Sequence, residues 1–435
     1  MKSVRVYKQP LGDLVLVYVP EADRVYAVDS KESPLVPDEI ELANDEVRWT
    51  EYDRARETTP SDLVLLLTTA CNLGCTYCYS NAGRGDHVMS MDIAEKAIVF
   101  IAERVKRAGG TGFSILFHGE GEPTANWPVL IKSVTFALEY AATLGLQVRF
   151  SIATNGAYGS EKRSYLSENI HNITVSMDGP RVVHERQRPR ASGASSFDEV
   201  MASADHFYQQ RHRLNFGLRA TILSENISML PEIVEFFGEK FPGADLSVEP
   251  VETLGRYATA RRQAFDGLAF AYREARKRAA KHGLRFWYSA VRGPRKTDFF
   301  CGVGGRSMVI GPTGVISGCS RVSQWKHAGA REFIYGQIEP SNPSPVRFGP
   351  AKLKVESYSG RNMPDCKNCI AYTWCRGDCR HIRYMENQDV LNGVSSRCRE
   401  IRTIVVGELL DALNLPSADM SLRHFYAEKA TPPFM

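Results

Sequence analysis

Three cysteines stand close together in the sequence, directly after the apolar run 63–67 (LVLLL). They are Cys71, Cys75 and Cys78, and their spacing is C-x3-C-x2-C. Four thiolates complete a zinc site or a [4Fe–4S] cluster, whereas three thiolates around four irons leave one iron open to a small molecule. The spacing therefore favours a catalytic iron–sulfur cluster. A zinc ion completed by a distant ligand and a purely structural cluster are the alternatives.

The other seven cysteines lie in the last third of the chain. Four of them follow the spacing C-x2-C-x5-C-x3-C, and one more stands near residue 400. The cytosol keeps thiols reduced, so clustered cysteines in a cytosolic chain bind metal more often than they pair as disulfides. Taken alone, the group of four also fits a zinc ribbon. The seven are Cys301, Cys319, Cys366, Cys369, Cys375, Cys379 and Cys398.

The composition is that of an ordinary globular protein. The 435 residues are 43% hydrophobic and 24% charged, which is enough for two or three globular units. A formal net charge of +4 gives no case for nucleic-acid binding, which needs a domain-wide basic excess. The start of the chain lacks the apolar core of a signal peptide, and no aliphatic run approaches the roughly 20 residues of a membrane span. We therefore expect a cytoplasmic protein with no nucleic-acid or membrane partner.

The elements that must position the first cysteines alternate between strand and helix from residue 62 to residue 285. Strands are expected at 63–69, 113–118, 147–154, 173–177, 216–222 and 245–250. Helices are expected from near Ser90, from Pro128 to Gly145, near Lys162, from a capping box at Ser196 and Glu199, after Ser228, and at 260–281. Six such units predict a parallel sheet, either doubly wound or curved into a partial barrel.

The two ends of the chain are expected to be built differently. Residues 1–60 show short strands with a turn at Gly12 and Asp13, which is a β-hairpin pattern. The part after residue 285 is rich in Cys, Gly and Pro, and it ends in a helical pattern at 399–413.

Polar motifs follow the expected strands at their carboxyl ends. They are FHGEGEPT (117–124), ATNG (153–156), SMDGP (176–180) with HERQR just beyond it, and VEPV (248–251). Each motif alone is weak, because a lone TNG or DG is usually a turn. Together they predict a ligand site at the C-terminal edge of the sheet, where barrel enzymes build their active sites.

The cysteine motif after the first strand, with an aromatic residue before its last cysteine, closely resembles that of the radical S-adenosylmethionine (AdoMet) enzymes. The resemblance implies that the open iron chelates AdoMet, whose reductive cleavage gives a 5'-deoxyadenosyl radical that abstracts hydrogen from a substrate. It also implies that the strand-end motifs bind the ammonium, carboxylate, ribose and adenine groups of AdoMet. The residues in the matching positions are Tyr77, Gly119, Gly121, Glu122, Asn155, Ser176, Arg188, Glu249 and Val251. Glu120 stands where the family usually has glycine, so the direction of its side chain is open.

The C-terminal cysteines resemble the SPASM extension of this family, which carries auxiliary iron–sulfur clusters. The family's pattern implies one full cluster on Cys366, Cys369, Cys375 and Cys398, and part of another on Cys301, Cys319 and Cys379. Three [4Fe–4S] clusters result, and the last has an iron open to water, to the substrate or to an oxygen donor such as Asp298.

The resemblance extends over about residues 62–400 and implies a partial (β/α)6 TIM-type barrel. The expected domains are a β-rich region at 1–60, the barrel at 61–285, the SPASM domain at 286–400, and a helix and tail at 401–435.

SPASM-bearing members mostly modify peptides or proteins made on ribosomes. The resemblance therefore implies an enzyme that installs a crosslink or another oxidative modification in a precursor peptide or protein, with a reductant such as flavodoxin or ferredoxin. A sulfatase-type formylglycine maturase and a small-molecule dehydrogenase are alternatives, and an iron–sulfur electron carrier is the non-enzymatic one. Residues 1–60 are a candidate docking element for an extended peptide. The catalytic residues are not identified; Glu120, Asp178 and His118 are candidates near the barrel mouth.

Overall fold

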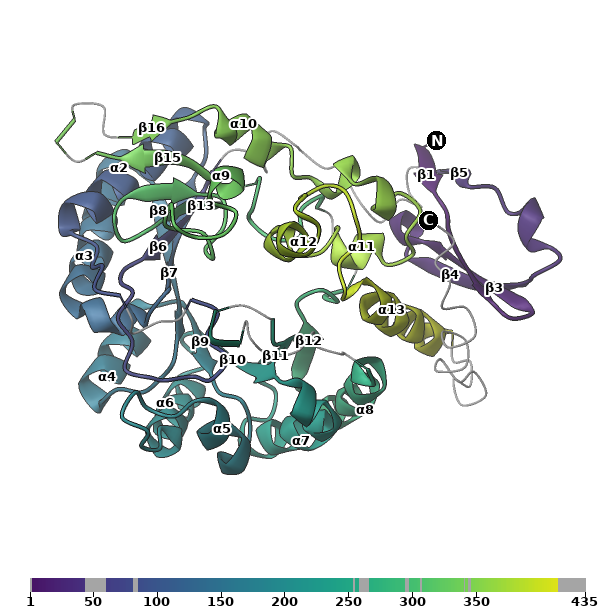
Figure 1. Ribbon diagram of the computed structural model, residues 1–435, viewed down its shortest axis with the longest axis horizontal. Helices are drawn as coiled ribbons and strands as arrows, with labels where there is room; N and C mark the ends of the chain where they lie inside the picture. The colour runs from purple at the N-terminus through teal and green to yellow at the C-terminus, as the bar shows by residue number, and fades with distance from the viewer. Residues whose placement is uncertain are drawn as a thin grey trace. The chain divides into compact units, whose positions relative to one another are not determined.

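The computed structural model describes residues 2–43, 60–80, 85–252, 255–257, 266–293, 297–305, 307–339, 341–342 and 346–413. The chain forms two compact units (Figure 1). The first comprises Met1–Asp53, Ala290–Phe300 and Ser359–Met435, and the second comprises Arg54–Ser289 and Cys301–Tyr358. The first unit thus combines both ends of the chain, which the sequence does not indicate. The predicted helix start at 260 and the tail after 413 lie outside the described residues.

The second unit contains one sheet of eleven strands, and the strands β6 to β12 lie in sequence order and are parallel. β13 joins β6 in parallel, and β14, β15 and β16 continue the sheet in antiparallel pairs. The bounds are β6 Asp62–Leu66, β7 Gly112–His118, β8 Gln147–Thr154, β9 Asn172–Ser176, β10 Asn215–Ile222, β11 Asp245–Pro250, β12 Arg285–Tyr288, β13 Ser307–Ile310, β14 Val315–Ser317, β15 Ile334–Ile338 and β16 Val346–Phe348.

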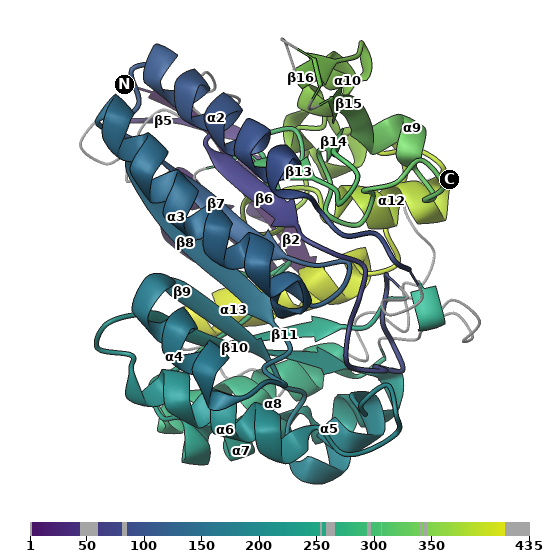
Figure 2. The same ribbon diagram turned by 90° about the vertical axis from the view of Figure 1, so that its left-hand side faces the viewer.

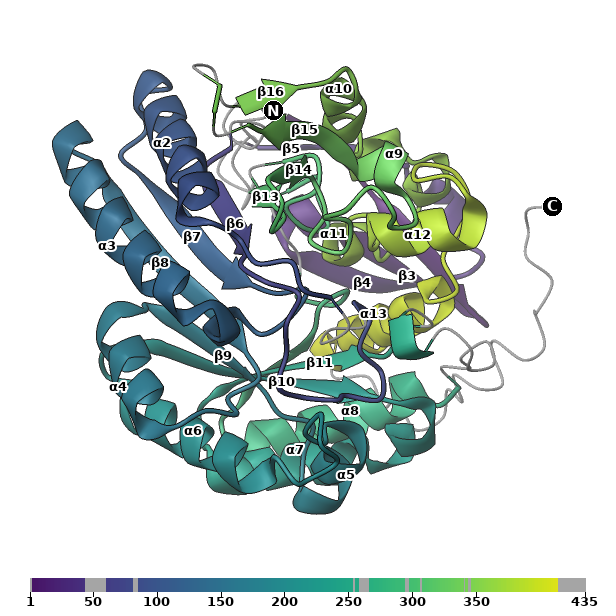
Figure 3. The same ribbon diagram turned by 60° about the vertical axis from the view of Figure 1, so that its left-hand side comes forward.

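Helices follow the parallel strands and lie along one side of their curved sheet (Figures 2 and 3). They are α2 Met91–Arg107, α3 Trp127–Leu144, α4 Ser160–Asn169, α5 Arg181–Gln187, α6 Phe197–Gln209, α7 Leu230–Lys240 and α8 Leu268–Lys281, with the short α9 Ala330–Phe333 and α10 Ala351–Glu356 near β15. A doubly wound sheet reverses its strand order and has helices on both faces. The order from β6 to β12 does not reverse, so the partial barrel is confirmed and the doubly wound alternative is wrong.

Burial alternates along β7, β8, β9 and β10. In β10, Phe216, Leu218 and Ala220 are buried, whereas Arg219 between them is exposed. Since successive side chains of a strand point to opposite faces, the apolar set packs toward the helices and the polar set lines the concave face.

Most helix ends follow the local signals in the sequence. The Ser90 side chain accepts a hydrogen bond from the backbone N–H of Ile93 at the start of α2, and Gly145 ends α3 in a left-handed conformation, φ 65°. The predicted capping box of α6 is wrong. Ser196 occupies the N-cap position without capping: its hydroxyl accepts from His184 Nε2 and donates to the carbonyl of Arg188, and Glu199 pairs with Arg190 instead.

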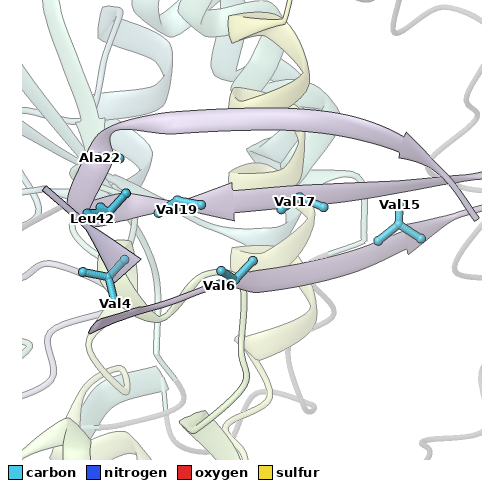
Figure 4. Packing of buried hydrophobic residues seen from close by; sticks show 7 residues of the cluster. All are labelled: Val4, Val6, Val15, Val17, Val19, Ala22 and Leu42. Atoms are coloured by element: carbon cyan, nitrogen blue, oxygen red, sulfur yellow. The ribbon is translucent and has the colours of Figure 1, made fainter. Parts of the chain in front are cut away.

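The first unit begins with two small sheets that share an apolar core. β1 (Lys2–Arg5) pairs with β5 (Glu39–Leu42), and β2 (Tyr7–Leu11), β3 (Leu14–Val19) and β4 (Arg24–Asp29) form an antiparallel sheet. The chain from Lys2 to Leu11 therefore forms two strands, because β1 and β2 have different partners. The buried core is Val4, Val6, Val15, Val17, Val19, Ala22 and Leu42 (Figure 4).

This N-terminal region packs against the cysteine-rich segment of the same unit. The Arg5 side chain donates to the carbonyl of Lys367 at 2.8 Å. Burial raises the pKa of Tyr7, and the charges of Tyr372 and Arg376 act on the same group. The helices of this segment are α11 Tyr372–Cys375, α12 Arg380–Asn387 and α13 Cys398–Ala412. Across both units, no helix among the described residues is long and apolar enough to cross a bilayer.

Candidate functional site

The first three cysteines lie on the loop that leaves β6 at the carboxyl edge of the sheet. The backbone N–H of Leu73 donates to Cys71 Sγ at 3.4 Å, and Ser80 Oγ lies 3.3 Å from Cys78 Sγ. Burial raises the pKa of the Cys71 thiol, and it raises the pKa of Cys75 to about 12. The charge of Cys78 adds to both shifts, so the three thiols are near enough to interact electrostatically.

The GEGEP turn after β7 packs directly on this loop. The backbone N–H groups of Gly121 and Glu122 donate to the carbonyls of Thr68 and Ala70, each at 2.9 Å. A Cβ atom on Gly121 would lie 2.0 Å from the Ala70 carbonyl oxygen, and one on Gly119 would lie 1.7 Å from the Gly121 oxygen. Both glycines are therefore required by backbone packing alone.

Glu122 is buried and accepts four hydrogen bonds. Its Oε1 accepts from the Thr124 N–H at 3.2 Å, the Thr124 hydroxyl at 3.0 Å and the Thr154 hydroxyl at 2.7 Å. Its Oε2 accepts from the backbone N–H of Asn155 at 2.7 Å. Burial raises the pKa of this carboxyl, and the four donors oppose the shift. Glu122 thus joins the ends of β7 and β8, and Oε2 accepts only one of the four bonds.

Asn155 connects the end of β8 to the cysteine loop. Its amide donates to Asn72 Oδ1 at 2.8 Å and lies 3.7 Å from Cys71 Sγ. Its own Oδ1 accepts from the backbone N–H of Ala157 at 2.8 Å. The predicted residue is therefore at the site, next to one thiol.

Tyr77, Asp178 and Arg188 form a buried network between the cysteine loop and β9. Tyr77 donates to Asp178 Oδ2 at 2.8 Å, and Arg188 Nη1 donates to the Tyr77 hydroxyl and lies 3.9 Å from Asp178. Asp178 also accepts from the Gln187 amide at 2.8 Å and the Thr221 N–H at 3.0 Å. Burial raises the pKa of Asp178, whereas the charge of Arg188 lowers it.

A second chain of hydrogen bonds, through His184 and Ser196, fixes the backbone of Arg188. The backbone N–H of Asp178 donates to His184 Nδ1 at 3.5 Å, so His184 Nε2 carries the proton and donates to Ser196 Oγ at 3.1 Å. The Ser196 hydroxyl then donates to the Arg188 carbonyl. Burial lowers the pKa of His184 to about 3, and the Arg188 charge lowers it further, so the imidazole is neutral.

The remaining predicted contacts lie at the same edge of the sheet. Ser176 ends β9 and is half-buried. Glu249 in β11 is buried and accepts from the Ser289 hydroxyl at 2.7 Å and the Ser289 N–H at 3.2 Å. Val251 is buried, and its N–H donates to the Ile222 carbonyl at 2.8 Å.

Comparison with known proteins now decides the family. Residues 65–237, which run from β6 into α7, match the family model of the radical SAM superfamily. This part of the chain is a radical SAM domain. A cysteine-type anaerobic sulfatase-maturating enzyme of Clostridium perfringens is 22% identical over 357 residues, which span 76% of this chain and 91% of that protein. A serine-type counterpart of Bacteroides thetaiotaomicron is 28% identical over 176 residues, 39% of this chain and 41% of that protein.

Two solved structures show the same fold. The structure of native anSMEcpe with bound AdoMet and Kp18Cys peptide has a TM-score of 0.62 at 20% identity, and the likeness covers 82% of this chain and 99% of that chain. SuiB of Streptococcus suis bound to precursor peptide SuiA has a TM-score of 0.55 at 14% identity, over 92% of this chain and 100% of that chain. The predicted partial-barrel architecture is thereby confirmed.

The donor set of the loop fits the cluster of a radical SAM enzyme. Among the described residues, no group of three or more His, Cys, Asp or Glu side chains is arranged to hold one metal ion. Zinc ligands converge on one centre, whereas each thiolate of a [4Fe–4S] cluster binds a different iron. Three neighbouring thiols suit three irons of such a cluster and leave its fourth iron open. Arg188 Nε, which is buried without a hydrogen-bond partner, suits an anionic group of AdoMet.

Four of the seven C-terminal cysteines lie near one another in the first unit. In the first unit, burial raises the pKa of Cys375, and the charges of Cys366, Cys369 and Cys398 raise it further. These four thiols are therefore neighbours. Cys379 is buried in the same unit, whereas Cys301 is exposed and Cys319 is buried in the second unit. The assignment of these three to one cluster stays a prediction.

Asp298 does not have a free carboxylate for that cluster. Its Oδ2 pairs with the Arg361 guanidinium, and its Oδ1 accepts from the Tyr372 hydroxyl at 3.3 Å. The side chain is buried in the first unit. These contacts therefore argue against Asp298 as the fourth ligand of the cluster predicted on Cys301, Cys319 and Cys379.

Glu120 points away from the cysteine loop toward the segment after Cys319. The Gln324 amide donates to its Oε2 at 2.8 Å, the Ser323 hydroxyl donates to its Oε1, and His327 Nδ1 lies 3.5 Å from Oε1. With both oxygens engaged, Glu120 is a positioning residue. Asp178 is engaged in the same way, so neither suits a general base.

His118 remains the candidate with an open nitrogen. It ends β7, and its Nδ1 is buried without a hydrogen-bond partner. Burial lowers the pKa of His118 to about 4, and the charges of Arg219 and Arg321 contribute. The imidazole is therefore neutral and a weak base.

Sequence reasoning missed the residues that support the site. Gln187 links Asp178 to Asn226, and Asn72 links the cysteine loop to Ala157 at 2.7 Å. Both residues lie inside motifs named above, Asn72 in the cysteine motif and Gln187 in HERQR, but at positions to which the family resemblance assigns no role. A polar residue inside a motif loop, such as Asn72, was the only available signal.

Proposed function

We propose that the protein uses AdoMet and a [4Fe–4S] cluster on Cys71, Cys75 and Cys78 to modify an extended peptide or protein segment. The observation that carries this proposal is the fold likeness to SuiB with its precursor peptide, which spans 92% of this chain and the whole of the other. The likeness to anSMEcpe with a bound peptide supports the same substrate class. The concave face of the barrel is the site proposed for the peptide.

The chain's own residues suit this role. When bound, AdoMet and the reduced cluster supply a carbon-centred radical that removes a hydrogen atom from the substrate. Arg188, fixed by Tyr77 and Asp178, would hold the AdoMet carboxylate or ribose through its free Nε. Glu122 would receive the ammonium group at Oε2, which accepts a single protein hydrogen bond. Asn155 and Asn72 would fix the cysteine loop against β8.

Sulfatase maturation is the second candidate, and one observation favours it. The cysteine-type maturase is matched over 91% of its length, although SuiB is matched over more of this chain. A maturase oxidises a Cys or Ser side chain to an aldehyde, whereas a crosslinking enzyme joins two residues. The two reactions therefore leave chemically different products on a peptide.

We also propose two auxiliary [4Fe–4S] clusters. The neighbouring thiols of Cys366, Cys369, Cys375 and Cys398 support the first. The second would use Cys301, Cys319 and Cys379 and have one iron open to substrate or water. A flavodoxin or ferredoxin would supply electrons, and a cytoplasmic location stays a prediction.

The test is anaerobic reconstitution with iron and sulfide, followed by incubation with AdoMet and dithionite. We expect 5'-deoxyadenosine, and we expect none from Cys71→Ala, Cys75→Ala or Cys78→Ala. Thr76→Ala on the same loop is the matched control, because Thr76 is not a ligand. Turnover by the cysteine variants would disprove the radical function. A Cys- or Ser-containing sulfatase peptide then separates the candidates, since only a maturase would give a hydrazide-reactive aldehyde.

A further inference from the structure

Arg256 contacts both ends of the turn that joins Cys75 to Cys78. Its Nη1 donates to the Cys75 carbonyl at 3.0 Å, and its backbone N–H donates to the Cys78 carbonyl, also at 3.0 Å. The turn is closed by the Cys78 N–H, which donates to the Cys75 carbonyl at 3.3 Å. A residue distant in the sequence therefore fixes the backbone that carries two of the three thiols of the loop.

Gly255 allows the close approach of Arg256 to this turn. The φ angle of Gly255 is 57°, which is in the left-handed region, and a Cβ atom at this position would overlap the carbonyl oxygens of Cys78 and Tyr79. Any larger residue would therefore push the segment away from the cysteine loop. The position of Arg256 thus depends on the glycine directly before it.

Other segments hold the loop through a different set of groups. The backbone N–H groups of Gly74 and Thr76 donate to the carbonyls of Pro189 and Gln187 at 2.7 and 2.9 Å. These bonds use donors of the loop, whereas Arg256 supplies donors to its carbonyls. Loss of the Arg256 side chain would therefore release one end of the turn and leave the rest of the loop attached.

The segment that contains Arg256 follows β11 and contacts the loop at a further point. Arg321 Nη2 donates to Glu252 Oε1 at 2.7 Å, and the Arg321 guanidinium lies 5.4 Å from the centre of the Tyr79 ring. Glu252 stands directly after Val251, which is predicted to lie near the adenine of AdoMet. The segment after β11 thus joins the cysteine loop to the strand end proposed for AdoMet.

We propose that Arg256 is a positioning residue for the cluster on Cys71, Cys75 and Cys78, and that its guanidinium holds the C-x2-C turn in the conformation in which both thiolates reach their irons. The proposal rests on the cluster assigned under the proposed function. A hydrogen bond from a charged donor is about twice as strong as one between neutral groups. The positive charge also lies beside a turn that carries two thiolates, which favours their ionised form.

The measurement is the rate at which reconstituted full-length protein loses this cluster to a ferrous-iron chelator. EPR spectra of the reduced protein are recorded with and without saturating AdoMet, and their difference reports only the cluster that binds AdoMet. Residues that orient metal ligands typically contribute about tenfold or more to metal affinity. Arg256→Met should therefore lose the difference signal about tenfold faster than the unaltered protein, and Arg256→Lys, which keeps a charged donor, should restore most of the stability of the cluster.

Arg163→Met is the matched control for the side chain. The half-buried Arg163 of α4 also donates to a backbone carbonyl, that of Tyr158 at 2.9 Å, but this carbonyl lies outside the cysteine loop. Gly255→Ala tests the approach while the guanidinium is retained, and it should also speed the loss of the cluster. Its control is Gly243→Ala, because Gly243 has a φ of 77° but a Cβ there would meet no described atom within 4 Å. Both controls should lose the cluster at the unaltered rate.

Thermal unfolding of the cluster-free proteins separates positioning of the cluster from general support of the fold. We expect Arg256→Met to lower this melting temperature no more than Arg163→Met does. A larger loss in the cluster-free protein would make Arg256 a structural residue and overturn the proposal. An unchanged rate of cluster loss in Arg256→Met, or an equal rate in Arg163→Met, would overturn it too. If the unaltered protein gave no AdoMet-dependent signal, the proposed function itself would be wrong.

Discussion

Glu122→Gln tests whether the GEGEP carboxylate is a structural junction as well as a ligand. Two backbone N–H groups approach Glu122 from different loops, that of Thr124 at Oε1 and that of Asn155 at Oε2. A glutamine has one oxygen and one NH2 group, so it can accept from only one of them. The other N–H would face a second donor in a buried site.

The expected loss of stability in Glu122→Gln follows from that one unsatisfied N–H donor. A buried polar group left without a partner costs about 1–3 kcal/mol. The hydroxyls of Thr124 and Thr154 can rotate and accept from the new NH2 group, so they add little. Replacing the charge also removes its burial cost, which is large enough to raise the pKa of Glu122. We therefore expect a loss of about 2 kcal/mol, equal to about 4–8 °C in melting temperature for a domain of this class.

Glu249→Gln is the matched control. Glu249 is also a buried strand-end glutamate, but its two donors are the N–H and hydroxyl of Ser289. A glutamine can accept from the N–H and donate to the hydroxyl, so the cost should stay below about 0.5 kcal/mol. Thermal unfolding of the cluster-free variants measures both.

The result that would refute this reasoning is equal stability of the two variants. If the proposed ammonium contact at Oε2 is also correct, Glu122→Gln should weaken AdoMet binding about tenfold in reconstituted protein, because a charge-assisted contact is lost. Loss of stability with unchanged AdoMet affinity would confine Glu122 to the structural role.

Three further predictions concern buried polar groups. Glu120→Gly should speed amide hydrogen exchange in the loop after β14 while 5'-deoxyadenosine formation persists, and unchanged protection would contradict its positioning role. Asp178→Asn leaves Arg188 without its carboxylate and should cost about 3–5 kcal/mol, whereas Asp198→Asn at an exposed ion pair should cost less than about 1 kcal/mol in the same unfolding assay. The third concerns His184, whose pKa in the folded protein is about 3. The unfolded chain binds this proton more readily, so the free energy of unfolding should fall as the pH drops below about 6.5. The fall should reach about 2 kcal/mol at about pH 5, and a flat profile from about pH 7 to 5 would contradict it.

The elements that carry local signals could be predicted from the sequence. Ser90 and Gly145 mark helix ends that the structure reproduces, because their caps need only nearby backbone. Ser196 had an equally good local signal, yet its hydroxyl accepts from His184 Nε2 and donates to the carbonyl of Arg188. A local rule fails where a tertiary partner competes for the same group.

The residues of the site also divide into those that a local motif reveals and those that depend on distant partners. Cys71 and Glu122 were found because their motifs are contiguous in sequence. The direction of Glu120 could not be found, since its partners Ser323 and Gln324 lie some two hundred residues away. The barrel's strand order placed the motifs together, but the contacts among them depend on loops that have no periodic pattern.

The N-terminal region illustrates how the structure changes an experiment. Deletion of residues 1–55 would remove the Arg5 contact with Lys367 and expose the side of the cysteine segment, so it cannot distinguish peptide docking from cluster support. β4 offers a cleaner test, because it is the last strand of its sheet among the described residues and Tyr26 on it is 45% exposed. An extended peptide can add to such an edge.

Tyr26→Ser should therefore lower modification of a peptide substrate severalfold while the peptide-independent formation of 5'-deoxyadenosine and the iron content stay unchanged. Leu35→Ser is the matched control, because Leu35 is 82% exposed in the same region but lies outside β4. If both variants modify the peptide equally poorly, the loss comes from removing any exposed apolar side chain of this region and not from a change at the edge of β4. If neither loses it, peptide docking by β4 is wrong, and the N-terminal sheet serves only to support the cysteine segment that Arg5 and Tyr7 contact.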